Sequence, residues 1–135
     1  MPNNDVNSIV IDDRDNKWIG TSGGLTRFDG TNWIVYNTSN SGLPSDSVGL
    51  IAIEENGNKW IACSGLVKFD GTNWTVYNTS NSGLPNAKYE NYYQFNDYVT
   101  AVHSIAIDSY GNKWIGTSCG LAVFKEGGVV SVEEN

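Results

Sequence analysis

The chain has 135 residues, of which 39% are hydrophobic, which is enough for one domain with a hydrophobic core. Its formal net charge is −7 and it has no basic stripe, which argues against a nucleic-acid partner because phosphate binding needs clustered Lys and Arg. No apolar run reaches the length of a membrane span, and the N-terminus lacks the pattern of a signal peptide.

Four short strands joined by tight turns are predicted in the first part of the chain. Their expected ranges are 6–11, 17–21, 25–28 and 33–36. Asp29-Gly30 supplies the turn between the last two, since Gly tolerates positive φ. The strands are rich in β-branched and aromatic residues, and no stretch shows a sustained apolar period of 3.6 residues, so we expect almost no helix.

The same pattern returns twice further along the chain. The expected strands are 48–53, 59–63, 66–69 and 74–77 in the second copy, and 102–107, 113–117, 121–124 and 129–132 in the third. The sequence Asn-Lys-Trp-Ile anchors every copy, at 16–19, 58–61 and 112–115. Four strands in about 40–45 residues is the size of one β-propeller blade. The chain is therefore interpreted as a single unit with blades at about 5–44, 47–85 and 101–135.

The first strand of each copy is apolar on both faces. In the first copy Ile9 and Ile11 point one way and Val10 points the other. Such a strand is expected in a sheet that lies between two neighbouring sheets. The predicted fold class is all-β: a β-propeller of four-stranded antiparallel blades, three blades per chain.

Three blades cannot close a ring, because propellers typically have four to eight. Two chains give six blades and three chains give nine, so we predict a homodimer that forms a six-bladed ring. Burying roughly 500 Å² of apolar surface per open face would contribute on the order of 12 kcal/mol before entropic costs. The alternative is that the chain is a piece of a longer propeller.

The run at 16–30, with its continuations at 33–37 and 41–44, resembles the two-component regulator propeller repeat. Members of that family are mostly bacterial, often periplasmic sensor regions of histidine kinases or secreted proteins, and many bind carbohydrates. The resemblance implies a propeller fold and a periplasmic or extracellular location. It implies a function only weakly, because propellers host many unrelated activities. The chain departs from the family in having three repeats, a lost glycine at 63–66 and Val129 in place of a tryptophan.

The anchor tryptophans Trp18, Trp60 and Trp114 are interpreted as structural residues. Their identical place in each repeat favours packing between blades over the stacking of a ligand. The acidic segments before them are interpreted as hairpin turns rather than calcium loops, because the copies do not keep the number of carboxylates.

An insert at about 86–98 separates the second and third blades. It gathers five aromatic residues: Tyr89, Tyr92, Tyr93, Phe95 and Tyr98. Aromatic rings beside amide side chains suit the recognition of a saccharide or peptide, and inserts in repeat proteins often lie on the binding face. The alternative is that these rings fold the insert onto the propeller or form the dimer contact. His103, the only histidine, is a further candidate for a ligand contact near the central channel, or else a core histidine.

Three functions are consistent with these patterns. The first is a non-enzymatic binding or sensing module with a saccharide or peptide ligand. The second is a structural, self-assembling unit without a small ligand. The third is a lyase-type propeller enzyme, disfavoured by the single histidine and the lack of a repeated Cys or His cluster. The sequence thus predicts no catalytic residue, no metal and no cofactor.

Overall fold

The computed structural model describes residues 5–77, 102–117, 120–125 and 128–133, which form only strands and turns. Sheet 1 consists of β1 (Val6–Ile11), β2 (Lys17–Thr21), β3 (Gly24–Phe28) and β4 (Trp33–Tyr36). Sheet 2 consists of β5 (Ile51–Ile53), β6 (Lys59–Ala62), β7 (Leu66–Phe69) and β8 (Trp74–Tyr77). Sheet 3 consists of β9 (Val102–Ile107), β10 (Lys113–Thr117), β11 (Gly120–Lys125) and β12 (Gly128–Glu133). Neighbouring strands in each sheet are consecutive and antiparallel, so the predicted all-β class is confirmed.

Turn chemistry explains why the strands reverse where they do. Between β3 and β4, the Asp29 carboxylate accepts hydrogen bonds from the backbone N–H groups of Thr31 (2.9 Å) and Asn32 (2.7 Å). Gly30 in this turn has φ of 103°, a conformation that side chains other than that of glycine rarely allow. The same two hydrogen bonds recur around Asp70 in sheet 2. The repeated Asp-Gly pairs therefore set the register of the outer hairpins.

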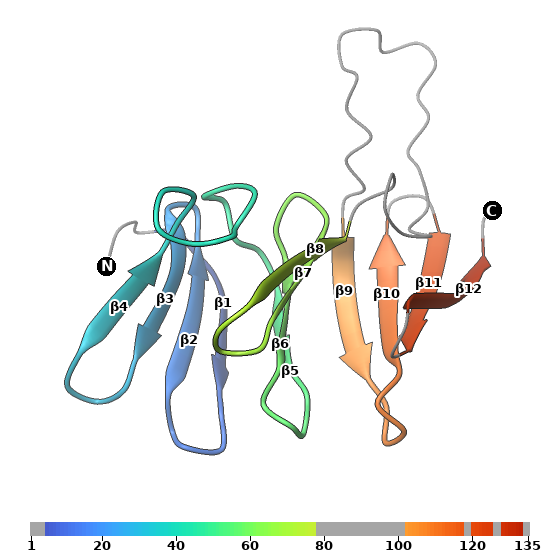
Figure 1. Cartoon of the computed structure of the whole chain (residues 1–135), viewed down its shortest axis with the longest axis horizontal. Coiled ribbons are helices and arrows are strands. Elements are labelled where there is room, and N and C mark those ends of the chain that lie inside the picture. The colour runs from blue at the N-terminus through green and yellow to red at the C-terminus, as the bar shows by residue number, and fades with distance from the viewer. Residues whose placement is uncertain (1–4, 78–101, 118–119, 126–127, 134–135) are drawn as a thin grey trace, which may run out of the picture.

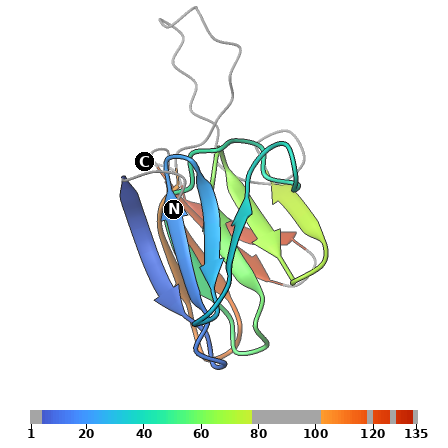
Figure 2. The ribbon, with the colours of Figure 1, turned by 90° about the vertical axis from the view of Figure 1, so that its left-hand side faces the viewer.

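Sheet 2 lies between sheet 1 and sheet 3 (Figure 1), and the turned view shows the sheets stacked face to face (Figure 2). The core between sheets 1 and 2 contains Trp18, Leu25, Leu43, Val48, Ile51, Ile61, Cys63, Val67 and Phe69. The core between sheets 2 and 3 contains Trp60, Leu66, Ile115, Ala122 and Phe124. Among the described residues, sheet 2 alone has a neighbouring sheet on each face. Sheets 1 and 3 each have one face that no other described sheet covers, which we call the open face.

The segment that leads into sheet 2 differs from the prediction. A strand was expected at 48–53, but β5 begins at Ile51. The Val48 N–H donates to the carbonyl of Thr21 in sheet 1, at 2.8 Å. Gly49 and Leu50 instead both pair with Ala62 of β6, so the regular ladder of sheet 2 begins after them. Gly20 permits the close approach, since a Cβ there would lie 2.7 Å from the carbonyl oxygen of Gly49. This contact fixes how closely sheets 1 and 2 approach.

The described residues include no helix long and apolar enough to span a membrane.

Candidate functional site: the clefts between sheets

Each contact between neighbouring sheets is built around an anchor tryptophan. Trp18 is 4% exposed, and its ring meets the edge of Phe69 from sheet 2 at 6.1 Å and 69°. Trp60 is 3% exposed and meets Phe124 from sheet 3 at 6.1 Å and 66°. The two contacts therefore repeat the same edge-to-face geometry, which aromatic pairs favour.

An acidic residue holds the indole of every anchor tryptophan. The Nε1–H of Trp18 donates to Asp12 at 2.9 Å, and that of Trp60 donates to Glu54 at 2.7 Å. In sheet 3 the Nε1–H of Trp114 donates to a carboxylate oxygen of Asp108, at 3.0 Å. In all three copies the acid stands six positions before the tryptophan and closes the turn between the first and second strands. Sequence reasoning compared the number of carboxylates in these turns and missed this constant position.

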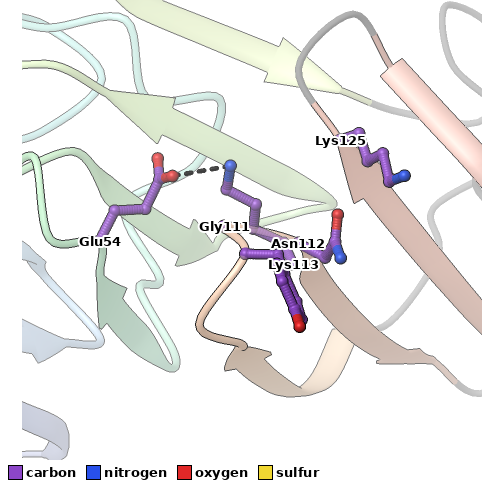
Figure 3. Close-up of a pocket in the computed structure, with 6 residues that line it drawn as sticks. Glu54, Gly111, Asn112, Lys113 and Lys125 are labelled. Carbon is purple, nitrogen blue, oxygen red and sulfur yellow. Dashed lines mark ion pairs between the residues drawn. The ribbon is translucent and has the colours of Figure 1, made fainter.

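A lysine from the next sheet completes each buried contact. The Nζ of Lys59 lies 4.4 Å from the ring centroid of Trp18, and the Nζ of Lys113 lies 5.0 Å from that of Trp60. Lys113 also forms an ion pair with Glu54 at 2.7 Å (Figure 3), and the two side chains are 8% and 10% exposed. We call the acid, the tryptophan and the lysine of the next sheet an anchor cluster. The first is Asp12, Trp18 and Lys59, and the second is Glu54, Trp60 and Lys113.

The surroundings shift the acid–base equilibria of these clusters. Burial raises the pKa of Glu54, but the hydrogen bonds from Lys113 and Trp60 outweigh burial and hold that pKa below its usual range. For Asp12, burial is likewise outweighed by hydrogen bonds from Trp18 and its own turn, and the pKa falls to about 2. The Asp108 pKa also falls to about 2, chiefly because Trp114 donates to its carboxylate. These acids are ionised at neutral pH.

Stability should therefore decrease in acid. A carboxylate whose pKa is lower in the folded state stabilises the fold above its unfolded pKa, near 4, and this contribution is lost as pH falls toward about 2. We expect the urea midpoint to fall over that range. Asp12→Asn should be less stable at pH 7 but show a smaller loss between pH 4 and pH 2. If the urea midpoint of Asp12→Asn falls as steeply between pH 4 and pH 2 as that of the unchanged chain, Asp12 is not the source of the acid sensitivity.

Two clefts lie beside the anchor clusters. The larger, of about 550 Å³, is lined by Glu54, Tyr110, Gly111, Asn112, Lys113 and Lys125 (Figure 3). The smaller, of about 320 Å³, lies beside Trp18 and is lined by charged side chains of both signs, among them Asp13, Arg27 and Asp70. Such a lining offers both donors and acceptors to a polar ligand. The turns that close these clefts lie at the lower end of the sheets in Figure 1, whereas β8 ends and β9 begins at the opposite end.

No protein-family model and no curated protein matches the chain. Solved structures do match. The extracellular domain of the hybrid two-component system BT3049 from B. thetaiotaomicron superposes with a TM-score of 0.76 at 23% identity, over 99% of this chain and 17% of that chain. The extracellular domain of BT4673 gives a TM-score of 0.72 at 17% identity, over 96% and 16%. The chain has the β-propeller fold of these extracellular domains.

This chain spans less than a fifth of the length of those two structures. Virginiamycin B lyase from Staphylococcus aureus shares the fold with a TM-score of 0.69 at 12% identity, over 97% of this chain and 41% of that one. At this identity the likeness shows the fold and says nothing of activity. Among the described residues, no group of three or more His, Cys, Asp or Glu gathers where it could hold a metal ion.

The residues that the sequence analysis singled out differ in their exposure and in whether the structure describes them. Trp114 is 41% exposed, unlike Trp18 and Trp60, because no further sheet of the described residues covers this face of sheet 3. His103 lies on β9, an edge strand beside β5, and its exposed side chain does not fit a core histidine. The aromatic insert residues Tyr89, Tyr92, Tyr93, Phe95 and Tyr98 lie outside the described part of the chain. Their part in binding stays a prediction.

Proposed function

We propose that the chain is a non-enzymatic sensing module, part of a periplasmic or extracellular propeller that binds a saccharide or peptide. The observation that supports this best is the likeness of nearly the whole chain to extracellular domains of two-component systems. An extracellular domain can contact soluble saccharides and peptides outside the cell. The location and the function proposed here rest on the same likeness.

The chemistry of the chain favours a polar ligand with flat apolar faces. The insert offers Tyr92 and Tyr93 among Asn, Gln and Glu side chains, so that rings can stack while amides hydrogen-bond. Exposed His103 follows the insert on β9 and can add a further polar contact. The anchor clusters hold neighbouring sheets together, which assigns their tryptophans to packing. Binding is therefore assigned to the insert, and the clefts are the competing location.

Array binding can test the site. The chain should bind at least one class of glycan or peptide, and the double variant Tyr92→Ala/Tyr93→Ala should bind it roughly tenfold more weakly, since each stacked ring contributes about 0.5–1.5 kcal/mol. Tyr110→Ala is the matched control, because Tyr110 is 88% exposed and lines the larger cleft. Binding constants from calorimetry would follow the array.

Two results would reject this assignment. If the chain binds no glycan and no peptide, the sensing proposal is wrong. If Tyr110→Ala weakens binding as the double variant was expected to, while the double variant binds normally, the ligand lies in the cleft and not at the insert.

A second role, self-association into a closed ring, is favoured by one specific observation. Ile9, Ile11 and Trp33 on sheet 1 are 60%, 58% and 51% exposed. Large apolar side chains gathered on one face of a sheet typically mark an interaction surface. We propose that a second copy of the chain covers this face, as the predicted homodimer requires. Light scattering showing twice the mass of one chain is the expected result.

A further inference from the structure

The open face of sheet 1 repeats a face that is buried elsewhere in the molecule. In sheet 2, the cross-strand row of Lys59, Phe69 and Trp74 packs against Trp18 of sheet 1. In sheet 1 the same row is Lys17, Phe28 and Trp33. The aromatic pair of each row is stacked, with centroids 4.2 Å apart for Phe28 and Trp33 and 3.8 Å apart for Phe69 and Trp74. The open row thus has the composition and the ring geometry of a row that already binds an anchor tryptophan.

The two rows differ in the exposed fraction of their side chains. Phe69 is 3% exposed and Lys59 is 9% exposed, whereas Trp33 is 51% exposed and the Lys17 side chain is 33% exposed. The first strands behave in the same way, since Ile51 is 6% exposed and its counterpart Ile9 is 60% exposed. The exposed part of this face of sheet 1 is thus the Lys17–Phe28–Trp33 row with Ile9 and Ile11, whereas Ile19, Thr21 and Thr26 on the same face are buried.

The open face of sheet 3 presents the opposite half of an anchor cluster. Trp114 is 41% exposed, yet its Nε1–H donates to Asp108 at 3.0 Å, as Trp60 donates to Glu54. Asp108 is further fixed by Asn112, whose backbone N–H and side-chain Nδ2 both donate to its carboxylate. The acid and the tryptophan of a third anchor cluster are in place, and a lysine from a following sheet would complete it.

We propose that the Trp114 face of sheet 3 docks on the Lys17–Phe28–Trp33 face of sheet 1 in a second copy of this chain. Lys17, which pairs with Asp15 of its own chain at 3.1 Å, then extends in the second copy over the Trp114 indole and beside Asp108, as Lys113 lies over Trp60 and beside Glu54. Phe28 of the second copy packs against the Trp114 ring in an edge-to-face arrangement, as Phe124 does with Trp60. Opposite charges and matching aromatic geometry are thus brought together on both sides of the contact.

A second copy is the occupant that satisfies both open faces at once. Two chains supply six sheets, within the four to eight of closed propellers, and the two contacts of such a ring use all four open faces. This contact specifies the self-association proposed above by naming its residues. It is independent of the saccharide or peptide ligand, so a failure of ligand binding leaves it untouched.

Single substitutions should break the contact from either side. We expect the 135-residue chain to be a dimer by light scattering, and Trp114→Ala to raise its dissociation constant at least about thirtyfold, as for a tryptophan at the centre of an interface. Lys17→Glu should raise it at least about tenfold, because it sets a carboxylate against Asp108. Tyr110→Ala is the aromatic control, since Tyr110 lines the cleft toward sheet 2, and it should leave the dimer unchanged. Circular dichroism of each variant checks that it is folded, which the partial exposure of Trp114 and Lys17 favours.

Mixing the two variants gives the decisive measurement. In a mixed pair, one contact carries both substitutions and the other carries neither. Because residues 17 and 114 touch in the proposed contact, losing both should cost less than the sum of the two single losses, so the dissociation constant of the mixed dimer should lie below the geometric mean of the two single-variant values. A monomeric unchanged chain at all concentrations would overturn the proposal. So would dimers that survive both single substitutions, or a mixed dimer whose dissociation constant equals that geometric mean.

Discussion

Glu54→Gln should lower the free energy of unfolding by about 3–5 kcal/mol, although it changes one atom of the side chain and retains an acceptor for Trp60. The reason is that the substitution leaves Lys113 without its ion-pair partner. Lys113 Nζ lies 2.7 Å from the Glu54 carboxylate, and both side chains are about nine-tenths buried. Without Glu54, the Lys113 ammonium is left charged and buried between two sheets, where an unpaired charge is costly.

A double variant separates the ion pair from the packing around it. Lys113→Met keeps the straight apolar stem over Trp60 and removes the charge, so Glu54→Gln/Lys113→Met should unfold with a smaller loss than Glu54→Gln alone. Urea unfolding at one fixed protein concentration is the measurement, because association with a partner alters apparent stability. A loss below about 1 kcal/mol for Glu54→Gln would mean that water screens the pair, as it does at protein surfaces.

The three anchor tryptophans should differ widely in what their removal costs. Trp60→Ala is expected to lower the free energy of unfolding by about 3–5 kcal/mol, because Trp60 is 3% exposed and its loss leaves a cavity among Tyr77, Phe124 and Lys113. Trp114→Ala should cost about 1 kcal/mol or less when measured on the monomer, since its ring is 41% exposed and no other sheet in the described part of the chain packs on it. The same residue type at the same repeat position thus has two different effects.

Denaturant unfolding at a concentration that keeps the chain monomeric would check this contrast. Tyr110→Ala, at an 88% exposed ring, gives the baseline for removing an aromatic side chain that packs little. Equal losses for Trp60→Ala and Trp114→Ala would show that the anchors stabilise their own sheet rather than the contact with the next one.

Much of the fold could be predicted from the sequence because the signals are local and repeated. Turn residues such as Asp29-Gly30 and the Asn-Lys-Trp-Ile anchors recur at matched places, so the strands and their order follow from one unit. The start of β5 was missed because Val48 bonds to a carbonyl of the neighbouring sheet, while Gly49 and Leu50 both pair with Ala62 of β6. A hydrogen bond between sheets leaves no periodic trace in the sequence.

The candidate site was harder to predict, because its parts come from different sheets. The lysine directly before each anchor tryptophan was given no role in the sequence analysis, yet Lys59 and Lys113 reach the tryptophan of the preceding sheet. Equal spacing of Asp12 and Glu54 from their tryptophans was a readable signal. The exposure of Trp114 could not be predicted from the sequence, because it depends on whether another sheet packs on sheet 3.

The close approach at Gly20 also governs what kind of assembly such a chain can build. Because a Cβ at Gly20 would lie 2.7 Å from the Gly49 carbonyl oxygen and 2.9 Å from Val48 Cγ1, sheet 1 and the segment leading into sheet 2 approach too closely here for any side chain at position 20. A contact between unlike ends closes only when the rotations from sheet to sheet add up to one full turn, and otherwise it continues as an open filament. We expect Gly20→Ala to push sheets 1 and 2 apart and so to change that rotation, which in the proposed ring would favour open filaments over closed dimers.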